Sequence, residues 1–235
     1  MALPKLNDKP KYELVIPSTD NRVRFRPYLV KEEKVLMMAL ESQDKVSALN
    51  AVVDTIIACV DDDIQKKNLT LFDIEYMFIM IRSKSVGEVT DIGIKCQKCD
   101  AVNEIPIKLD DVEIKRDDNE NYDIELEENI SLKMKYPNFI DVLKSEESKG
   151  SETDKAFDMI GKCIDSVTTE EEHISMNDVS QKEVNDFIES LNTTQFGMIR
   201  TFIEKMPKVQ KEIEFTCASC KEHNEVTLQG IDDFF

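Results

Sequence analysis

Glycine and histidine are scarce in this sequence, and their scarcity limits the chemistry that the chain can support. Among 235 residues there are six glycines and two histidines. So few glycines leave little material for phosphate-cradling loops, and neither a Gly-x-Gly-x-x-Gly motif nor a Walker loop is present. Only His173 and His223 could serve as side-chain bases with an ordinary pKa near neutrality. We therefore expect no enzymatic activity, although a hydrolase whose carboxylates meet only in the folded chain stays an alternative.

Basic residues and long apolar runs are lacking as well. The chain has 48 acidic against 30 basic residues and a net charge of −18, which excludes broad contact with duplex phosphates because such contact needs clustered Lys and Arg. The densest apolar stretch, residues 76–81, is too short to cross a bilayer, and the N-terminus has no secretory signal. We expect a soluble protein of a reducing cytoplasm, whose acidic surface serves solubility or meets a basic protein partner.

Hydropathy periodicity predicts an α+β fold. Alternating residues predict a hairpin from strands at 12–16 and 22–25. Helical spacing of apolar residues predicts helices over 30–41, 46–60, 71–82 and from about 193 to 206, one that opens at Ser180 and carries apolar residues from 184 to 191, and another that starts near residue 154. Shorter alternating stretches predict strands at 89–94, 105–107, 112–114, 124–126 and 209–215. Ser180 and Glu183 form a capping box, and Pro207 ends the last helix.

The order of these elements suggests four segments. We expect an N-terminal β-hairpin with helices (1–86), a first cysteine-bearing β segment (87–136), a helical segment (137–207) and a second cysteine hairpin (208–235). The second and fourth segments are expected to pack together. Polar residues predict a loop at 117–121 and a flexible linker or loop tip at 144–154. One helical face is expected to carry Ala156, Phe157, Ile160 and Ile164.

An internal repeat contains the most specific motif of the chain. Residues 94–107 and 215–228 both read apolar-x-Cys-x-x-Cys-x-x-x-Asn-Glu-aliphatic-x-aliphatic. Each cysteine pair is flanked by alternating segments, so each should lie at the tip of a β-hairpin.

Two such hairpins that face each other would complete a four-thiolate zinc site of the zinc-ribbon kind. The predicted metal ligands are Cys96, Cys99, Cys217 and Cys220. Four thiolates leave no open coordination position, so the zinc is expected to be structural and to fasten the middle of the chain to its C-terminus. His223 is expected to be an exposed turn residue and not a ligand.

Other interpretations of the cysteine pairs stay open. Each pair could be half of a site shared between two chains, and the oligomeric state is left undecided. The metal could have been lost, with the hairpins kept. A redox role is disfavoured because strands flank the pairs, whereas a redox Cys-x-x-Cys opens a helix.

The remaining sulfur-containing residues have plainer interpretations. Cys59 and Cys163 are single and lie on helix-like stretches, so we expect small buried hydrophobes. The methionines at 37, 38, 77 and 80 are expected to lie mainly in the core, with an adaptable partner surface as the alternative.

A family resemblance adds to these observations. Residues 12–19 read Tyr-Glu-Leu-Val-Ile-Pro-Ser-Thr, and residues 24–34 read Arg-Phe-Arg-Pro-Tyr-Leu-Val-Lys-Glu-Glu-Lys before a helix that ends near residue 42. This stretch resembles the baseplate hub assembly proteins of T4-like contractile-tailed phages, and the two Asn-Glu zinc-knuckle hairpins are similar to those of the same group. The likeness covers about the first forty residues and returns at the cysteine pairs.

The resemblance implies a non-enzymatic protein of phage tail morphogenesis. Such a protein would help the central hub of the baseplate to form, as an assembly chaperone or as a hub component, through contacts with hub or tail proteins. It would act in the host cytoplasm during assembly and could remain in the virion. The alternative is a zinc-ribbon adaptor of a nucleic-acid machine, for which a basic stripe would be expected. Edges of the N-terminal hairpin or the Met-bearing helices are the expected contact surfaces.

Overall fold

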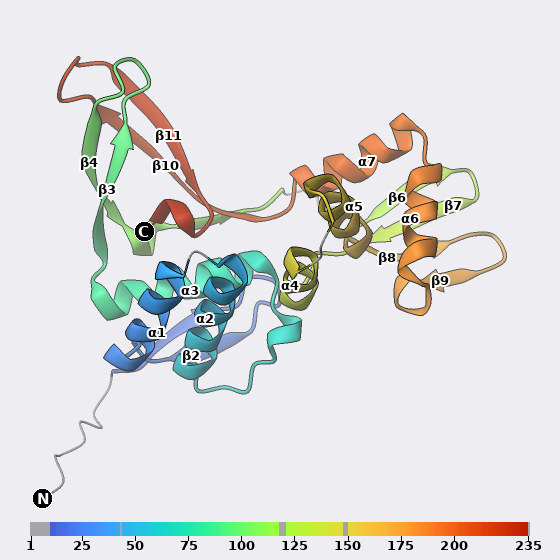
Figure 1. Ribbon diagram of the computed structural model, residues 1–235, viewed down its shortest axis with the longest axis horizontal. Helices are drawn as coiled ribbons and strands as arrows, with labels where there is room; N and C mark the ends of the chain where they lie inside the picture. Colours follow the sequence, from blue (N-terminus) through green and yellow to red (C-terminus); the bar gives the residue numbers. More distant parts are fainter. Residues whose placement is uncertain (1–9, 43, 118–120, 148–149, 235) are drawn as a thin grey trace, which may run out of the picture. The chain divides into compact units, whose positions relative to one another are not determined.

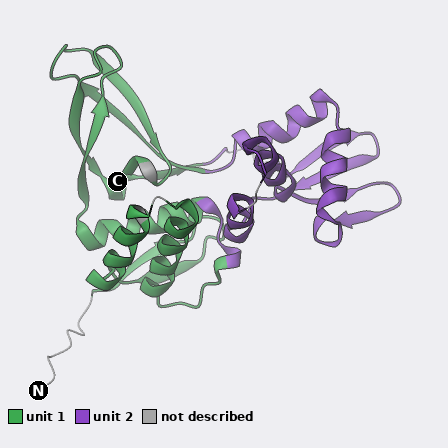
Figure 2. Cartoon of the chain, in the orientation of Figure 1, with its two compact units in different colours: residues 1–66, 72–115, 208–235 green, residues 67–71, 116–207 purple. Residues whose placement is uncertain are grey.

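The fold is taken from a computed structural model that describes residues 10–42, 44–117, 121–147 and 150–234 (Figure 1). The chain forms two compact units (Figure 2). Unit 1 comprises residues 1–66, 72–115 and 208–235, and unit 2 comprises residues 67–71 and 116–207. Helices combine with small antiparallel sheets in both units, which confirms the α+β prediction.

The N-terminal part of unit 1 consists of a hairpin and helices, as predicted. Its elements are β1 (Tyr12–Val15), β2 (Arg22–Phe25), α1 (Val30–Glu41), α2 (Lys45–Cys59) and α3 (Leu71–Val86). The hairpin buries Leu14, Val23 and Phe25, because alternate residues of each strand face the same side. Its turn is fixed to α3, where the buried carboxylate of Asp73 accepts a hydrogen bond from the Ser18 backbone N–H (2.8 Å).

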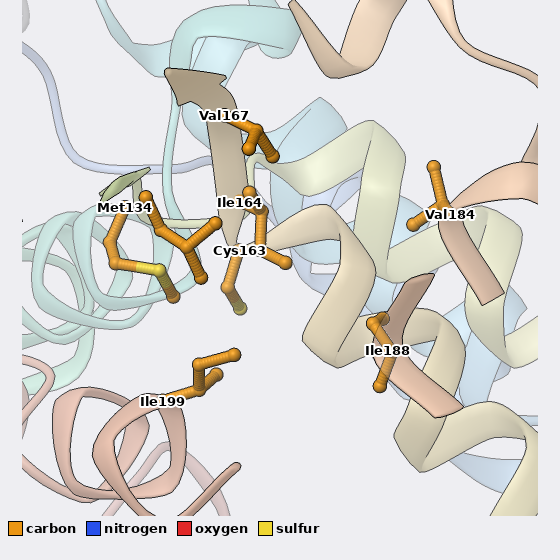
Figure 3. Close-up of a cluster of buried hydrophobic side chains, with 8 residues drawn as sticks. Met134, Cys163, Ile164, Val167, Val184, Ile188 and Ile199 are labelled. Atoms are coloured by element: carbon orange, nitrogen blue, oxygen red, sulfur yellow. The ribbon is translucent and has the colours of Figure 1, made fainter. Parts of the chain in front are cut away.

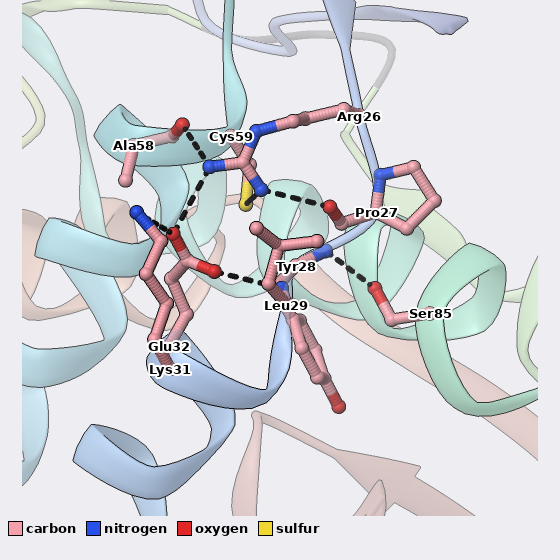
Figure 4. A network of polar contacts seen from close by, with 9 residues as sticks. All are labelled: Arg26, Pro27, Tyr28, Leu29, Lys31, Glu32, Ala58, Cys59 and Ser85. Carbon is pink, nitrogen blue, oxygen red and sulfur yellow. Dashed lines mark hydrogen bonds and ion pairs between the residues drawn. The ribbon is translucent and has the colours of Figure 1, made fainter. Parts of the chain in front are cut away.

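The Arg-Phe-Arg-Pro stretch after β1 has a structural role, which Figure 4 shows. The guanidinium of Arg26 donates to the carboxylate of Glu32 (3.0 Å) and to the carbonyl of Ala58 (2.8 Å). Glu32 in turn accepts from the Leu29 backbone N–H (2.7 Å). These bonds join the end of β2 to the start of α1 and the end of α2. The N-terminal residues that carry the family resemblance therefore hold this part of unit 1 together.

This network also sets the ionisation of Glu32. Burial alone would raise the pKa of Glu32, but the Leu29 N–H, the Arg26 guanidinium and the Lys31 ammonium together hold it below its ordinary value of 4.5. Glu32 therefore stays ionised, although it is only 7% exposed.

The two cysteine hairpins and one short strand complete unit 1. The first hairpin pairs β3 (Val89–Lys95) with β4 (Val102–Lys108). The second pairs β10 (Lys208–Thr216) with β11 (His223–Gln229), and β5 (Glu113–Lys115) adds to the start of β10. Short 3₁₀ turns lie at Lys66–Asn68, Leu109–Asp111 and Asp232–Phe234. The predicted strands at 89–94, 105–107 and 209–215 fall within these elements, and the one predicted at 112–114 overlaps β5, which begins one residue later.

Unit 2 packs helices on a four-stranded antiparallel sheet of order β6-β7-β8-β9. The strands are β6 (Asp123–Glu127), β7 (Ile130–Met134), β8 (Ile164–Thr168) and β9 (His173–Ser175), and a 3₁₀ turn follows at Met176–Asp178. The helices are α4 (Phe139–Glu147), α5 (Glu152–Lys162), α6 (Gln181–Ser190) and α7 (Thr193–Glu204). None of the helices in the described ranges has the length and apolar character to cross a membrane.

The core of unit 2 joins side chains of the sheet to those of the helices (Figure 3). Met134 on β7 and Val167 on β8 face Val184 and Ile188 on α6 and Ile199 on α7 within one buried cluster. Apolar residues recur at helical spacing on the helices and at alternate positions on the strands, so each element contributes one face.

Side chains at the helix N-termini fix where three of these helices begin. Ser180 accepts from the Glu183 backbone N–H while Glu183 accepts from that of Ser180, which confirms the predicted capping box. The same reciprocal pattern joins Ser151 to Asp154 at the start of α5 and Asn192 to Gln195 at the start of α7.

One prediction for this region is wrong. The flexible linker or loop tip expected at 144–154 is largely helical in the described residues, because α4 runs to Glu147 and α5 begins at Glu152. Its polar residues are helix ends and solvent-facing positions, and buried Ser145 donates to the Lys155 carbonyl (3.3 Å). The loop expected at 117–121 lies mostly outside the described residues.

Ile164 was also misplaced on a helical face. The helix ends at Lys162, Cys163 caps it, and Ile164 begins β8, where it pairs with Met134. Ile164 follows Ile160 at helical spacing, but the helix has ended between them, so the spacing is coincidental. Strands β7, β8 and β9 were not predicted. Residues 130–134 of β7 do alternate between apolar and polar, but the partner strand β8 follows only after α4 and α5, and β9 has only three residues.

The lone cysteines are buried as predicted, and the methionines divide. Cys59 and Cys163 are each 1% exposed. Met77 is completely buried, whereas Met37 and Met38 on α1 are 57% and 59% exposed. The core interpretation thus holds for α3 and fails for α1.

Candidate metal centre

Each Cys-x-x-Cys pair lies in a tight turn at the tip of its hairpin. In the first turn the Cys96 N–H donates to the Ala101 carbonyl (2.9 Å), and the Asp100 N–H donates to the Cys96 carbonyl (3.0 Å). Equivalent bonds in the second turn start from Cys217 (2.8 Å) and from Lys221 (3.0 Å). The internal repeat of the sequence is therefore a repeat of backbone geometry.

The residue after the second cysteine of each pair is left-handed. Asp100 has a φ of 56° and Lys221 a φ of 61°. Non-glycine residues rarely adopt this conformation, and its occurrence at equivalent positions shows that the turn geometry is required twice.

The structure brings the four predicted ligands together. The sulfur atoms of Cys96, Cys99, Cys217 and Cys220 all lie within 4.8 Å of one another. The sulfurs of Cys96 and Cys220 are 3.6 Å apart, and those of Cys99 and Cys217 are 3.7 Å apart. A tetrahedral zinc with Zn–S bonds of about 2.3 Å requires sulfur–sulfur edges of about 3.8 Å. The spacing therefore fits one four-coordinate metal ion within a single chain.

Backbone N–H groups of the turns favour thiolates. The Lys98 N–H lowers the pKa of Cys96 against the opposing effect of desolvation. The N–H groups of Cys220 and Ser219 lower the pKa of Cys217 to about 6. Metal binding needs deprotonated sulfur, so these turns are prepared for it before an ion arrives.

Crowding of the sulfurs has the opposite effect on the fourth cysteine. The Glu222 N–H lowers the pKa of Cys220, but the neighbouring sulfur of Cys99, with desolvation and the other sulfurs, raises it to about 12 overall. Four thiolates at this distance repel one another unless a cation lies between them. The donor set therefore fits a soft divalent metal such as zinc.

A pair of asparagines joins the two hairpins reciprocally. The Asn103 side-chain oxygen on β4 accepts from the Ala218 N–H of the opposite turn (2.9 Å). The Asn224 side-chain oxygen on β11 accepts from the Gln97 N–H of the first turn (2.9 Å). Both asparagines are buried, at 8% and 1% exposure. We call these two crossed bonds the asparagine clasp.

Each asparagine also holds its own turn. The Asn103 amide nitrogen donates to the Ala101 carbonyl (2.9 Å) and lies 3.7 Å from the Cys217 sulfur. The Asn224 amide donates to the Glu222 carbonyl (3.0 Å). The clasp thus satisfies partly buried backbone groups of both turns and fixes the second pair of sulfurs against the first.

Sequence reasoning missed this role of Asn103 and Asn224. The signal was present, because the repeat places an asparagine four residues after the second cysteine in both copies. His223 is exposed as expected, but it is the first residue of β11 and not part of the turn, and it lies 3.6 Å from the Glu225 carboxylate.

Fold and site together define an α+β protein in which two Cys-x-x-Cys hairpins, distant in sequence, form a zinc-ribbon-like cluster of four sulfurs. Residues 9–235 match the family described as T4 bacteriophage base plate protein. The chain belongs to this family, which confirms the resemblance found at its N-terminus and cysteine hairpins.

Individual comparisons agree with this assignment. The chain is 24% identical over 188 residues to the "Baseplate hub assembly protein gp26" of Enterobacteria phage T4, which covers 79% of this chain and 83% of that protein. No solved structure matches the chain significantly.

Proposed function

We propose that this protein is a non-enzymatic factor of phage tail morphogenesis that assists, or forms part of, the central hub of the base plate. The observation that carries the proposal is the similarity to a hub assembly protein over most of both chains, within a family match that spans nearly the whole sequence. Its partners are then hub or tail proteins of the phage, and it acts in the host cytoplasm while the base plate assembles.

We assign the four cysteines a structural zinc ion. The four sulfurs use every position of a tetrahedral ion, so no position is left for a substrate. The ion would fasten β3–β4 to β10–β11 in unit 1, across more than a hundred residues of intervening sequence that include most of unit 2. Metal binding would then contribute directly to the folding free energy of unit 1.

We place the partner contact on α1. Val35, Met37 and Met38 are 50%, 57% and 59% exposed, which is unusual for large apolar residues on one helix. Methionine side chains adapt to varied apolar surfaces. Val102 on β4 serves as the control position, because it is an apolar residue of unit 1 that is also exposed, at 63%.

The acidity of the hairpins argues against the alternative of a nucleic-acid adaptor. Glu214 and Glu225 lie directly opposite each other in the β10–β11 register. Like charges at such positions destabilise a sheet and repel phosphates. A DNA or RNA band that the purified chain shifts in a gel at moderate salt would reopen that alternative.

The test uses a phage that lacks the gene and a tagged copy of the full chain supplied in trans. We expect wild-type protein to restore tail assembly and to recover hub or tail proteins from infected cells. Met37→Asn with Met38→Asn should weaken both, whereas Val102→Asn should not. Normal tails without the chain, or recovery of no tail protein by a copy that restores assembly, would overturn the proposal.

A further inference from the structure

Unit 2 contains a cavity that the metal centre and the family assignment do not explain. It has a volume of about 280 Å³ and lies between the sheet-edge strand β6 and one face of α7. The lining includes Met198, Thr201, Phe202 and Lys205, which recur at helical spacing on α7 and just after it, with Ile124 and Tyr136. The cavity is large enough for one long side chain.

Aromatic rings form one wall of the cavity. The rings of Tyr136 and Phe202 stack with centroids 5.7 Å apart and an angle of 17° between their planes. Tyr122 packs edge-on against both rings, at 5.6 and 6.0 Å. Its hydroxyl lies 3.3 Å from that of Tyr136. This packing fixes the rings of Tyr136 and Phe202, which are both half-buried.

Carboxylates line the same cavity. Asp117, Asp123 and Glu125 are lining residues, and the cation among them, Lys205, is paired with Asp117 at 2.8 Å. Asp123 and Glu125 have no ion pair with any described residue. An apolar aromatic wall beside unneutralised carboxylates is the arrangement that attracts an organic cation.

The charge of unit 2 favours the same kind of occupant. Its sequence has 22 acidic and 11 basic residues, so it carries a net charge of −11 out of −18 for the whole chain. A cationic partner surface would be steered towards this unit.

We propose that this cavity receives an arginine side chain of a partner protein. The planar guanidinium would stack on the Tyr136 and Phe202 rings while its N–H groups donate to Asp123 and Glu125. A lysine ammonium could use the carboxylates and a cation–π contact, but it has no planar group to stack on a ring and no fixed fork of donors. The proposal rests on the proposed function in one respect, namely that the protein acts through protein contacts.

The test follows the backbone amide signals of the full-length chain by NMR while small amides are added. The probes are N-acetyl-arginine methylamide, its neutral isostere N-acetyl-citrulline methylamide, and N-acetyl-lysine methylamide. We expect the arginine probe at millimolar concentration to shift signals of β6 and α7, the lysine probe to do so several-fold more weakly, and the citrulline probe to leave them in place.

Variants locate the binding groups. Asp123→Asn with Glu125→Gln should weaken arginine binding about ten-fold, which corresponds to about 1.4 kcal/mol, because two charge-assisted hydrogen bonds at exposed carboxylates would be lost. The control, Glu170→Gln with Glu171→Gln, removes the same charge from exposed positions between β8 and β9 and should bind as wild type. Phe202→Leu keeps an apolar wall but should also weaken binding.

Several results would overturn the proposal. They are equal responses to arginine and citrulline, equal responses to arginine and lysine, equal losses in the two charge variants, or no response to arginine. No hub or tail partner enters this experiment, so failure here leaves the hub proposal standing. Failure of the complementation test leaves the cavity proposal standing in the same way.

Discussion

The asparagine clasp gives the sharpest quantitative prediction for the metal centre. Asn103→Ala removes the acceptor of the Ala218 N–H and the donor to the Ala101 carbonyl, two partly buried bonds of 2.9 Å made by a buried side chain. A backbone N–H left without a partner costs about 1–3 kcal/mol when it is buried. We expect unit 1 to lose stability within that range with zinc bound, towards its lower end because the Ala218 N–H is only partly buried. Asn224→Ala should cost a similar amount, because its contacts mirror those of Asn103.

The same loss should appear in metal affinity. The clasp is formed when the two turns are docked, and docking is what gathers the sulfurs, so a loss of 1–3 kcal/mol corresponds to zinc binding weakened by about 5- to 150-fold. Competition with a chromogenic chelator measures the affinity, and guanidinium unfolding followed by circular dichroism measures the stability.

A matched control separates the clasp from the general loss of an asparagine. Asn185 on α6 accepts an exposed bond from Gln181 (3.0 Å), so Asn185→Ala should change stability by less than about 0.5 kcal/mol and leave zinc affinity alone. The reasoning would be refuted if Asn103→Ala bound zinc as tightly as wild type, or if Asn103→Ala and Asn185→Ala weakened zinc binding equally.

Three further predictions concern stability. The pKa of Glu32 is lowered in the folded chain, so its ionised form stabilises the fold at pH values above the ordinary pKa of 4.5, and this contribution is lost as the pH falls through the folded pKa. Glu32→Gln should therefore make stability fall less steeply at acid pH, and an unchanged dependence would contradict the Arg26–Glu32 network. Gly197→Ala on α7 should stabilise by up to about 1 kcal/mol because nothing lies within 4 Å of the new methyl group, whereas Gly161→Ala on α5 should destabilise because a methyl of α6 would lie 2.9 Å away; thermal melts that rank the pair in reverse order would argue against the packing. Ser166→Ala should leave stability unchanged or raise it by about 1 kcal/mol, because among the described residues its buried hydroxyl has no hydrogen-bond partner, and a clear fall in the melting temperature would reveal a partner.

The clustering of the four cysteines could be predicted from the sequence because its signal is local and doubled. Each Cys-x-x-Cys pair between alternating segments indicates a hairpin turn, and the second copy supplies the other two sulfurs. Asn103 and Asn224 were not assigned, since a buried asparagine acts here through a backbone group more than a hundred residues away. That distance is visible only in the folded chain.

The fold was predictable to a similar extent. Hairpins and amphipathic helices such as α1, α2 and α6 have strong local periodicity and fall where expected. In the sheet of unit 2 only β6 was predicted, at 124–126. Strands β7 and β8 pair across α4 and α5, so this pairing could not be inferred from neighbouring residues. The polar stretch at 144–154 was misread because helix caps and solvent-facing helix positions use the same residues as linkers. The four-segment division of the chain stays a prediction.

Cobalt(II) titration of the purified, metal-free full-length chain tests the central claim most directly. We predict saturation at one ion per chain, with the thiolate charge-transfer and tetrahedral ligand-field bands of a four-sulfur site, displacement by zinc, and loss of the bands in Cys217→Ser. Half an ion per chain with concomitant dimerisation, or a spectrum without four thiolates, would contradict a site closed within one chain.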